Sequence, residues 1–76
     1  MITAKLYGLL RIESGIKEVQ LEAGSVNEVL AHLAARGIPR KELSGCVILV
    51  NGNSANRRSK LTDGDRVVLM SPVAGG

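Results

Sequence analysis

Residues 25–39, Ser-Val-Asn-Glu-Val-Leu-Ala-His-Leu-Ala-Ala-Arg-Gly-Ile-Pro, contain the start, the buried face and the end of one helix. Ser25 and Glu28 fit a capping box, in which the serine hydroxyl accepts from the Glu28 amide and the glutamate side chain returns to the Ser25 amide. Apolar residues recur at the i, i+3, i+4, i+7 spacing of a buried stripe: Val26, Val29, Leu30 and Leu33. Gly37 then supplies the left-handed residue that commonly ends a helix. The sequence therefore predicts one amphipathic helix that begins near Ser25 and ends at Gly37.

The chain ahead of this helix has the character of two strands. Residues 2–12 alternate in part, and the apolar residues of one parity are Ile2, Ala4, Leu6 and Leu10. Residues 13–15, Glu-Ser-Gly, supply turn chemistry, and residues 17–21 resume extended character. We therefore predict an opening β-hairpin.

Further short elements follow the helix. They are, in order, a single helical turn at 40–43, a strand at 46–50 stopped by the turn dipeptide Asn51-Gly52, a polar segment at 53–60 with room for one short strand, a turn at 61–65 and a last strand at 66–70. Together with the opening hairpin, this order predicts an α+β fold in which one main helix covers a sheet of four to five strands.

Length and composition limit the class of protein. The 76 residues are too few to form two stable cores, so we expect a single domain spanning 1–76. The longest uncharged apolar stretch, residues 46–50, is far shorter than the ~20 residues of a membrane helix. The single Cys46 cannot form an internal disulfide, and the first residues do not resemble a signal peptide. We expect a soluble, cytoplasmic protein with no membrane partner.

The net charge of +3 is concentrated in two basic groups, at residues 36–41 and 57–60. Binding of single-stranded nucleic acid uses basic residues interleaved with stacking aromatics. Tyr7 is the only aromatic residue and lies near neither group in the sequence. We therefore expect no nucleic-acid partner, and the basic groups are either an ordinary solvated surface or a contact for an acidic protein.

Side chains that support enzyme chemistry are few and dispersed. His32 falls off the buried stripe of the helix, which favours a solvated position over a ligand or a base. Cys46 begins a strand and is expected to be a small core or edge residue, since no motif places a base beside it. Asp63 and Asp65 flank Gly64 in a pattern typical of a structural turn. The sequence therefore predicts no catalytic triad, no metal site, no phosphate cradle and no bound cofactor.

The end of the chain is its most unusual feature. Residues 71–76, Ser-Pro-Val-Ala-Gly-Gly, follow the last strand directly, and we expect them to form a flexible tail. Pro72 cannot donate to a sheet, so it directs the segment away from the domain. Two glycines without Cβ let the end enter a narrow channel and leave the terminal carbonyl unhindered. Taken alone, Gly75-Gly76 is equally compatible with a frayed terminus or a cloning remnant.

The working group of such a tail is the carboxylate of Gly76. It is ionised at neutral pH, and it is therefore a poor electrophile until an activating group such as adenylate is attached. We assign Gly76 as the reacting residue and expect a partner enzyme to activate it with ATP. Four residues are assigned to the presentation of this end: Pro72, Val73, Ala74 and Gly75.

Several segments together resemble one known family. They are residues 61–69, Leu-Thr-Asp-Gly-Asp-Arg-Val-Val-Leu, the terminal residues 71–76, residues 5–11, Lys-Leu-Tyr-Gly-Leu-Leu-Arg, and residues 50–52, Val-Asn-Gly. The chain resembles the ubiquitin-like sulfur carriers (MoaD/ThiS-like) over essentially its whole length, and within them the small subunit of molybdopterin synthase. The tail of that subunit usually carries two prolines, whereas here Ser71 stands at the first position and Pro72 keeps the second.

The resemblance implies both a fold and a mechanism. The fold is a ubiquitin-like β-grasp, with the opening hairpin and the last strand in one mixed sheet over the helix. In the mechanism, an adenylating enzyme related to those that activate ubiquitin forms an acyl-adenylate at Gly76, and sulfur transfer converts it to a thiocarboxylate. In molybdopterin synthase the loaded tail enters the large subunit, where sulfur is placed on a pterin precursor. The chain is then a carrier or a non-catalytic small subunit rather than an enzyme alone.

Three other functions stay open. A sulfur carrier for thiamine thiazole synthesis shares the fold and the Gly-Gly end, although Pro72 favours the molybdopterin branch. A ubiquitin-like protein modifier would use the same activated Gly76 to form an isopeptide bond with a lysine. A plain β-grasp interaction module would not need a free terminus, so only that module should tolerate extension of the chain past Gly76.

A carrier that binds several partners should expose apolar surface beyond its core. If Val67 and Leu69 face the helix, the alternating residues of the last strand face outward. The resulting partner-binding patch at the root of the tail would comprise Tyr7, Leu9, Val68 and Met70. The reverse parity would place the last two in the core, and we favour the outward orientation.

Overall fold

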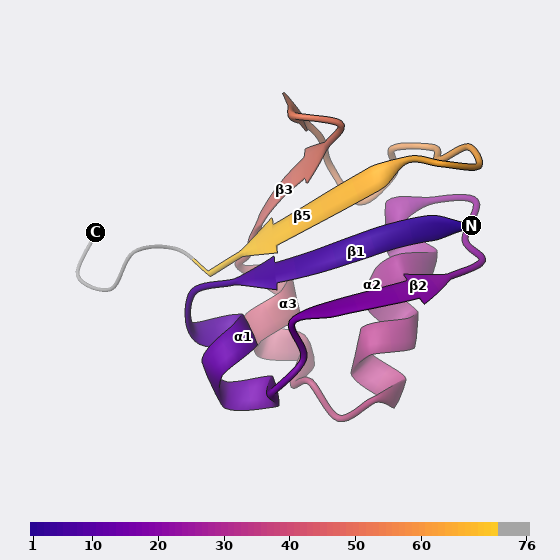
Figure 1. Ribbon diagram of the computed structural model, residues 1–76. Helices are drawn as coiled ribbons and strands as arrows, with labels where there is room; N and C mark the ends of the chain where they lie inside the picture. Colours follow the sequence, from indigo (N-terminus) through magenta and orange to yellow (C-terminus); the bar gives the residue numbers. More distant parts are fainter. Residues whose placement is uncertain (72–76) are drawn as a thin grey trace.

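The computed structural model describes residues 1–71, which form a five-stranded mixed sheet packed against helices (Figure 1). The elements in chain order are β1 Ile2–Tyr7, α1 Leu9–Ser14, β2 Glu18–Leu21, α2 Val26–Ala35, α3 Arg40–Ser44, β3 Val47–Val50, β4 Asn53–Ser54 and β5 Arg66–Met70. The strand order is β2-β1-β5-β3-β4, with β1 and β5 parallel and the other neighbours antiparallel. In Figure 1, α2 and α3 lie behind the sheet. This is the α+β, β-grasp arrangement that the sequence predicts.

The main covering helix, α2, begins and ends where the sequence predicts. The Ser25 hydroxyl accepts from the Glu28 amide at 3.3 Å, as predicted, and donates to Glu28 Oε2 at 3.4 Å. The Glu28 carboxylate is thus bonded to the Ser25 hydroxyl and not to the Ser25 amide, so only the first half of the predicted capping box is confirmed. At the other end, Gly37 has φ 105°, and the amides of Gly37 and Ile38 donate back to carbonyls of the last turn at 3.0 and 3.2 Å. This pair of bonds is a Schellman motif, which requires the left-handed glycine.

The core lies between α2 and the inner face of the sheet. Val67 and Leu69 of β5 are fully buried, so the inward parity predicted for the last strand is confirmed. The other buried apolar side chains are Ile2, Ala4, Leu6, Leu10, Leu21, Val26, Val29, Leu30, Leu33, Ile38, Leu43, Ile48 and Leu61. A one-residue slip of β5 would move its buried side chains to the outer face, and each would lose roughly 1.5–3 kcal/mol of burial. The burial pattern therefore fixes which side chains of β5 face outward.

The opening hairpin is the main correction to the sequence-based prediction. β1 and β2 do pair antiparallel, but β1 ends at Tyr7, and the helix α1 follows in place of a longer strand and a turn. Gly8, at φ 68°, interrupts the extended backbone, and Gly15, at φ 74°, ends α1. Leu10 fits the alternation of a strand by parity, yet it enters the core from a helix.

The elements after α2 follow the prediction closely. α3 supplies the helical turn expected at 40–43, and β3 ends at a turn in which Asn51 and Gly52 have φ of 51° and 84°. Positive φ at both central residues is typical of a type I′ hairpin turn, which Asn-Gly favours. β4 is the single short strand allowed within 53–60, and β5 begins after the predicted turn at 61–65. Among residues 1–71, none of the helices is long and apolar enough to cross a membrane.

Candidate functional site

The root of the tail lies where the two central strands end. Because β1 and β5 run parallel, their carboxyl ends lie side by side at one end of the sheet (Figure 1). Tyr7 lies opposite Met70 there. Ser71 follows directly and is half-buried. The predicted reacting residue Gly76 lies outside the described residues, and so do its presenting residues Pro72, Val73, Ala74 and Gly75. The roles assigned to those residues stay predictions.

An apolar group covers the outer face of the sheet beside this root. Met70 and Val68 of β5 are half-buried and point away from the core, as predicted. Tyr7, which is 40% exposed, lies opposite Met70 in β1. On the other side, Val47 of β3 lies opposite Met70 and is 46% exposed, and Leu49 lies opposite Val68. We refer to the side chains of Tyr7, Val47, Leu49, Val68 and Met70 as the outer apolar face.

The outer apolar face differs from the predicted patch in three residues. Leu9 is 49% exposed, but it is the first residue of α1, so it lies off the sheet face. Val47 and Leu49 were missed because residues 46–50 are uniformly apolar and show no inward parity. The signal that identifies them is the pairing of β3 with the outward residues of β5.

An ion pair borders the outer apolar face toward β2. Lys5 lies opposite Val68 in β1, and its Nζ is 3.7 Å from Oε1 of Glu18. The two side chains are 39% and 45% exposed, so the pair contributes little to stability. It marks the change from apolar to charged surface.

A hydrogen-bond network joins the turns at the opposite end of β5. The Asp65 carboxylate accepts from the Thr62 amide and from the Asn51 side-chain amide, both at 2.9 Å. The Arg66 amide donates to Asn51 Oδ1 at 3.0 Å. These bonds, with the Thr62 amide first, lower the pKa of the Asp65 carboxyl. The structural turn predicted at Asp63 to Asp65 is therefore confirmed.

Cys46 and His32 are not arranged for catalysis. The Cys46 thiol donates to the Leu43 carbonyl at 3.0 Å, and burial raises its pKa, so it stays protonated at neutral pH. His32 is half-buried, so the solvated position predicted for it is wrong. Its Nε2 is buried without a hydrogen-bond partner among the described residues. Within residues 1–71, no cluster of His, Cys, Asp and Glu could hold a metal ion.

The fold brings together one acidic pair that the sequence did not reveal. Glu13 of α1 and Glu42 of α3 line the same surface depression, together with Arg36. A hydrogen bond with Glu13 is the main cause that raises the pKa of the Glu42 carboxyl, and the negative charge of Glu13 adds to it. The pair was missed because the two residues are far apart in the sequence and meet only through the helices that carry them.

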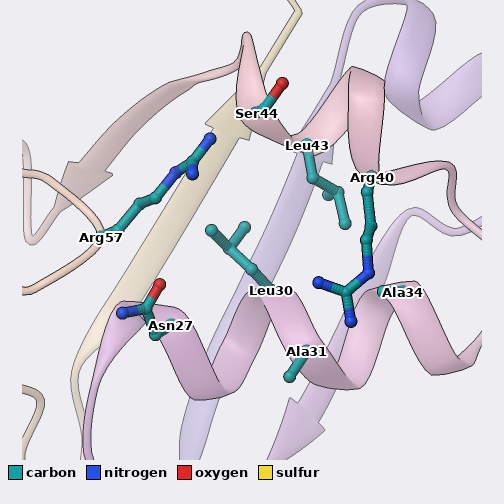
Figure 2. Close-up of a pocket in the computed structure, with 8 residues that line it drawn as sticks. All are labelled: Asn27, Leu30, Ala31, Ala34, Arg40, Leu43, Ser44 and Arg57. Atoms are coloured by element: carbon teal, nitrogen blue, oxygen red, sulfur yellow. The ribbon is translucent and has the colours of Figure 1, made fainter.

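An open cavity of about 320 Å³ lies between α2, α3 and the loop that carries Arg57 (Figure 2). Arg40 and Arg57 belong to the two basic groups of the sequence, and Figure 2 shows them on opposite sides of this cavity. Its other lining residues are Asn27, Leu30, Ala31, Ala34, Leu43 and Ser44. No carboxylate, imidazole or thiol is among the described lining residues, so the cavity offers positive charge without a base to activate a nucleophile.

Known proteins similar to this chain are small ubiquitin-like proteins. SAMP1 from Haloferax volcanii superposes with a TM-score of 0.81 at 24% identity, over 99% of this chain and 98% of that chain. The small archaeal modifier protein 1 from Methanosarcina acetivorans gives 0.79 at 26% identity, over 99% and 95% of the two chains. A chain of the complex of subunits 1 and 2 of molybdopterin-converting factor from Helicobacter pylori gives 0.75 at 25%, over 99% and 97%.

Sequence comparison gives the family directly. No curated protein sequence matches the chain. The ThiS family, however, matches residues 4–76, which is nearly the whole chain and includes its last residue. The sheet order, the parallel pairing of β1 with β5 and the position of α2 agree with that match. The chain therefore belongs to the ThiS family of ubiquitin-like sulfur carriers and modifiers.

Proposed function

We propose that this chain is a sulfur carrier that works through the carboxylate of Gly76, as the small subunit of a molybdopterin synthase. The observation that carries the proposal is the family match that extends through Gly75-Gly76 to the end of the chain. The fold supports it, since β5 lies in the centre of the sheet and passes directly into residues 71–76. In this proposal the chain itself supplies the carboxylate of Gly76 and the segment that carries it to a partner's active site.

The proposed chemistry takes place in two steps on partner enzymes. A Gly76 carboxylate oxygen attacks the α-phosphorus of ATP in an adenylating enzyme, and pyrophosphate leaves, which gives the acyl-adenylate. A sulfur nucleophile supplied by a persulfide donor then displaces AMP, and cleavage of the sulfur–sulfur bond by a reducing thiol leaves the thiocarboxylate. Oxygen is thereby exchanged for sulfur at the terminus, and the sulfur is later donated to a pterin precursor held by the large subunit. ATP is thus used by the partner and is not a cofactor of this chain.

The outer apolar face is the proposed contact for these partners. Its five side chains surround the end of β5, so a protein bound there would lie next to the first residue of the tail. Exposed apolar surface of this kind is typical of protein interaction sites. The adenylating enzyme and the large subunit would then bind the same face in turn, each with the tail in its active site.

The direct test is the intact mass of the chain after incubation with ATP, a sulfur source and the host's adenylating enzyme. A carrier gains the mass difference between one sulfur and one oxygen, and fragmentation places this gain on Gly76. The matched control is the same chain extended by one alanine after Gly76, which should gain nothing. An unmodified wild-type chain in the presence of an active enzyme would refute the proposal.

A protein modifier is the second candidate, because the chain superposes closely on a small archaeal modifier protein. A modifier would form an isopeptide bond between Gly76 and a lysine of another protein. High-mass adducts in the same incubation, made with host proteins present, would favour the modifier. A carrier for thiamine thiazole synthesis would gain the same sulfur, so it is separated by which acceptor enzyme removes that sulfur.

A further inference from the structure

Ser71, the first residue after β5, is tied to the start of α1. Its Oγ accepts a hydrogen bond from the Leu10 amide at 2.9 Å, across a separation of 61 residues. Leu10 is the second residue of α1, and the first amides of a helix have no partner within the helix. Gly8, at the N-cap, has no side chain to satisfy them. Ser71 therefore supplies, from the far end of the chain, the hydroxyl that a capping residue normally supplies locally.

Gly8 makes room for this contact. A Cβ added at Gly8 would lie 3.3 Å from Ser71 Oγ, and the backbone there has φ 68°, a conformation that L side chains rarely adopt. Immediately before Ser71, Met70 lies opposite Tyr7 in the parallel pairing of β5 with β1. The end of β5 is thus held at two successive residues, first by the sheet and then by the amide of α1.

We propose that Ser71 is a positioning residue, whose hydroxyl fixes the point at which the C-terminal segment leaves the domain. The inference rests on the proposed function, because it concerns how Gly76 is presented to a partner's active site. With Ser71 held, the remaining five residues reach about 17 Å at ~3.3–3.6 Å per residue. Without the bond, the last fixed residue is Met70, and six residues in place of five separate it from the terminal carboxylate, whose effective concentration at a partner's active site falls by roughly 1.3-fold to twofold.

Three variants isolate the role of the hydroxyl. Ser71→Ala removes it, and Ser71→Thr keeps an oxygen that can accept from the Leu10 amide. Ser44→Ala is the matched control, since its hydroxyl donates only to the Lys41 carbonyl within α3, at 2.9 Å. All three leave the outer apolar face and residues 72–76 unchanged, so a difference between them reports on the Ser71 hydroxyl and not on the partner surface.

The first measurement needs no partner. Amide hydrogen exchange by NMR should be about fivefold to tenfold faster at Leu10 in Ser71→Ala, the effect of losing one cap. The {1H}–15N NOE at Ser71 should fall in the same variant, because that residue gains motion. Ser71→Thr and Ser44→Ala should match the wild type at both sites. Unchanged exchange at Leu10 in Ser71→Ala would overturn the inference.

The second measurement tests the positioning role itself. In ATP–pyrophosphate exchange with the host's adenylating enzyme, kcat/KM should fall by about 1.3-fold to twofold for Ser71→Ala and recover for Ser71→Thr. Equal kcat/KM despite faster exchange at Leu10 would reduce the bond to a structural contact and overturn the positioning role. A wild-type chain that is not activated at all would refute the proposed function instead, while the exchange data would still decide whether Ser71 holds the segment.

Discussion

The two ends of β5 differ in their neighbours. Hydrogen-bonded polar side chains lie beside its start, whereas apolar side chains on the outer face of the sheet lie beside its end. The start is joined to the neighbouring turns by the bonds among Asn51, Thr62, Asp65 and Arg66. The end carries the outer apolar face, and beyond Met70 its one side-chain hydrogen bond among the described residues is that of Ser71 with Leu10.

The difference separates what stabilises the fold from what is available to partners. Bonds at the start of β5 join the turn at 51–52 to the turn at 61–65. Val68 and Met70 on the outer side of β5 are half-buried, although Val67 and Leu69 on the inner side of the same strand are fully buried. We infer that the start of the strand stabilises the fold and that its end binds partners, and four experiments test this difference.

The largest expected effect is on the inner side of β5. Leu69→Ala should lower the free energy of unfolding by about 2–5 kcal/mol, because a fully buried leucine is replaced by a cavity. Urea denaturation followed by circular dichroism measures the change. The matched control is Met70→Ala, the next residue on the outer side, which should cost about 1 kcal/mol or less. Equal losses for the two variants would contradict the assigned parity.

The next effect is on partner binding. Met70→Asp should weaken binding to the host's adenylating enzyme by about tenfold or more, because it places a charge in the middle of the outer apolar face. Its free energy of unfolding should change by about 1 kcal/mol or less, since the side chain lies outside the core. Calorimetric titration and urea denaturation give the two values. A stability loss as large as that of Leu69→Ala would show that Met70 belongs to the core.

Local signals predicted the parts of this fold that are fixed by neighbouring residues. Ser25, Glu28 and Gly37 define α2 because caps act within one turn of a helix. The parity of β5 was only favoured, since residues 67–70 are all apolar, and it is the burial of Val67 and Leu69 in the structure that fixes it. α1 was missed because the burial of Leu10 satisfies a strand pattern and a helix equally well.

Other features depend on contacts that no local pattern contains. The bond between Leu10 and Ser71 joins the two ends of the chain, and it forms only because β1 and β5 pair in parallel. Val47 and Leu49 became part of the candidate site through the pairing of β3 with β5. Such contacts depend on the order and direction of the strands in the sheet, and no short stretch of the sequence reveals that order.

A smaller loss of stability is expected at the start of β5. Asn51→Gly keeps the positive φ of the turn but removes the side-chain bonds to Asp65 and Arg66, so it should cost about 1–2 kcal/mol of unfolding free energy. Binding to the adenylating enzyme should not change. Asn53→Ala, an exposed change in β4, is the control and should be nearly neutral. Weakened binding in Asn51→Gly would contradict the separation of the two ends.

The smallest expected effect is a dependence on pH. The pKa of Asp65 is lowered from its ordinary value of 3.8, so its contribution to stability is present above that value and is lost as the pH falls through the lower folded pKa. Thermal midpoints of the wild type should therefore fall more steeply below about pH 5 than those of Asp65→Asn. Glu22→Gln, a change at an exposed carboxylate after β2, should keep the steep wild-type profile. Parallel curves for the wild type and Asp65→Asn would show that the network does not hold the carboxylate ionised.

The central claim, that the end of β5 presents Gly76 for activation, is tested most directly by intact and fragment mass spectrometry. The wild-type chain is incubated with ATP, a sulfur source and the host's adenylating enzyme. We predict exchange of one oxygen for sulfur at Gly76, and no exchange in the chain extended by one alanine. Absence of sulfur in the wild type, or equal exchange in the extended chain, would contradict the account.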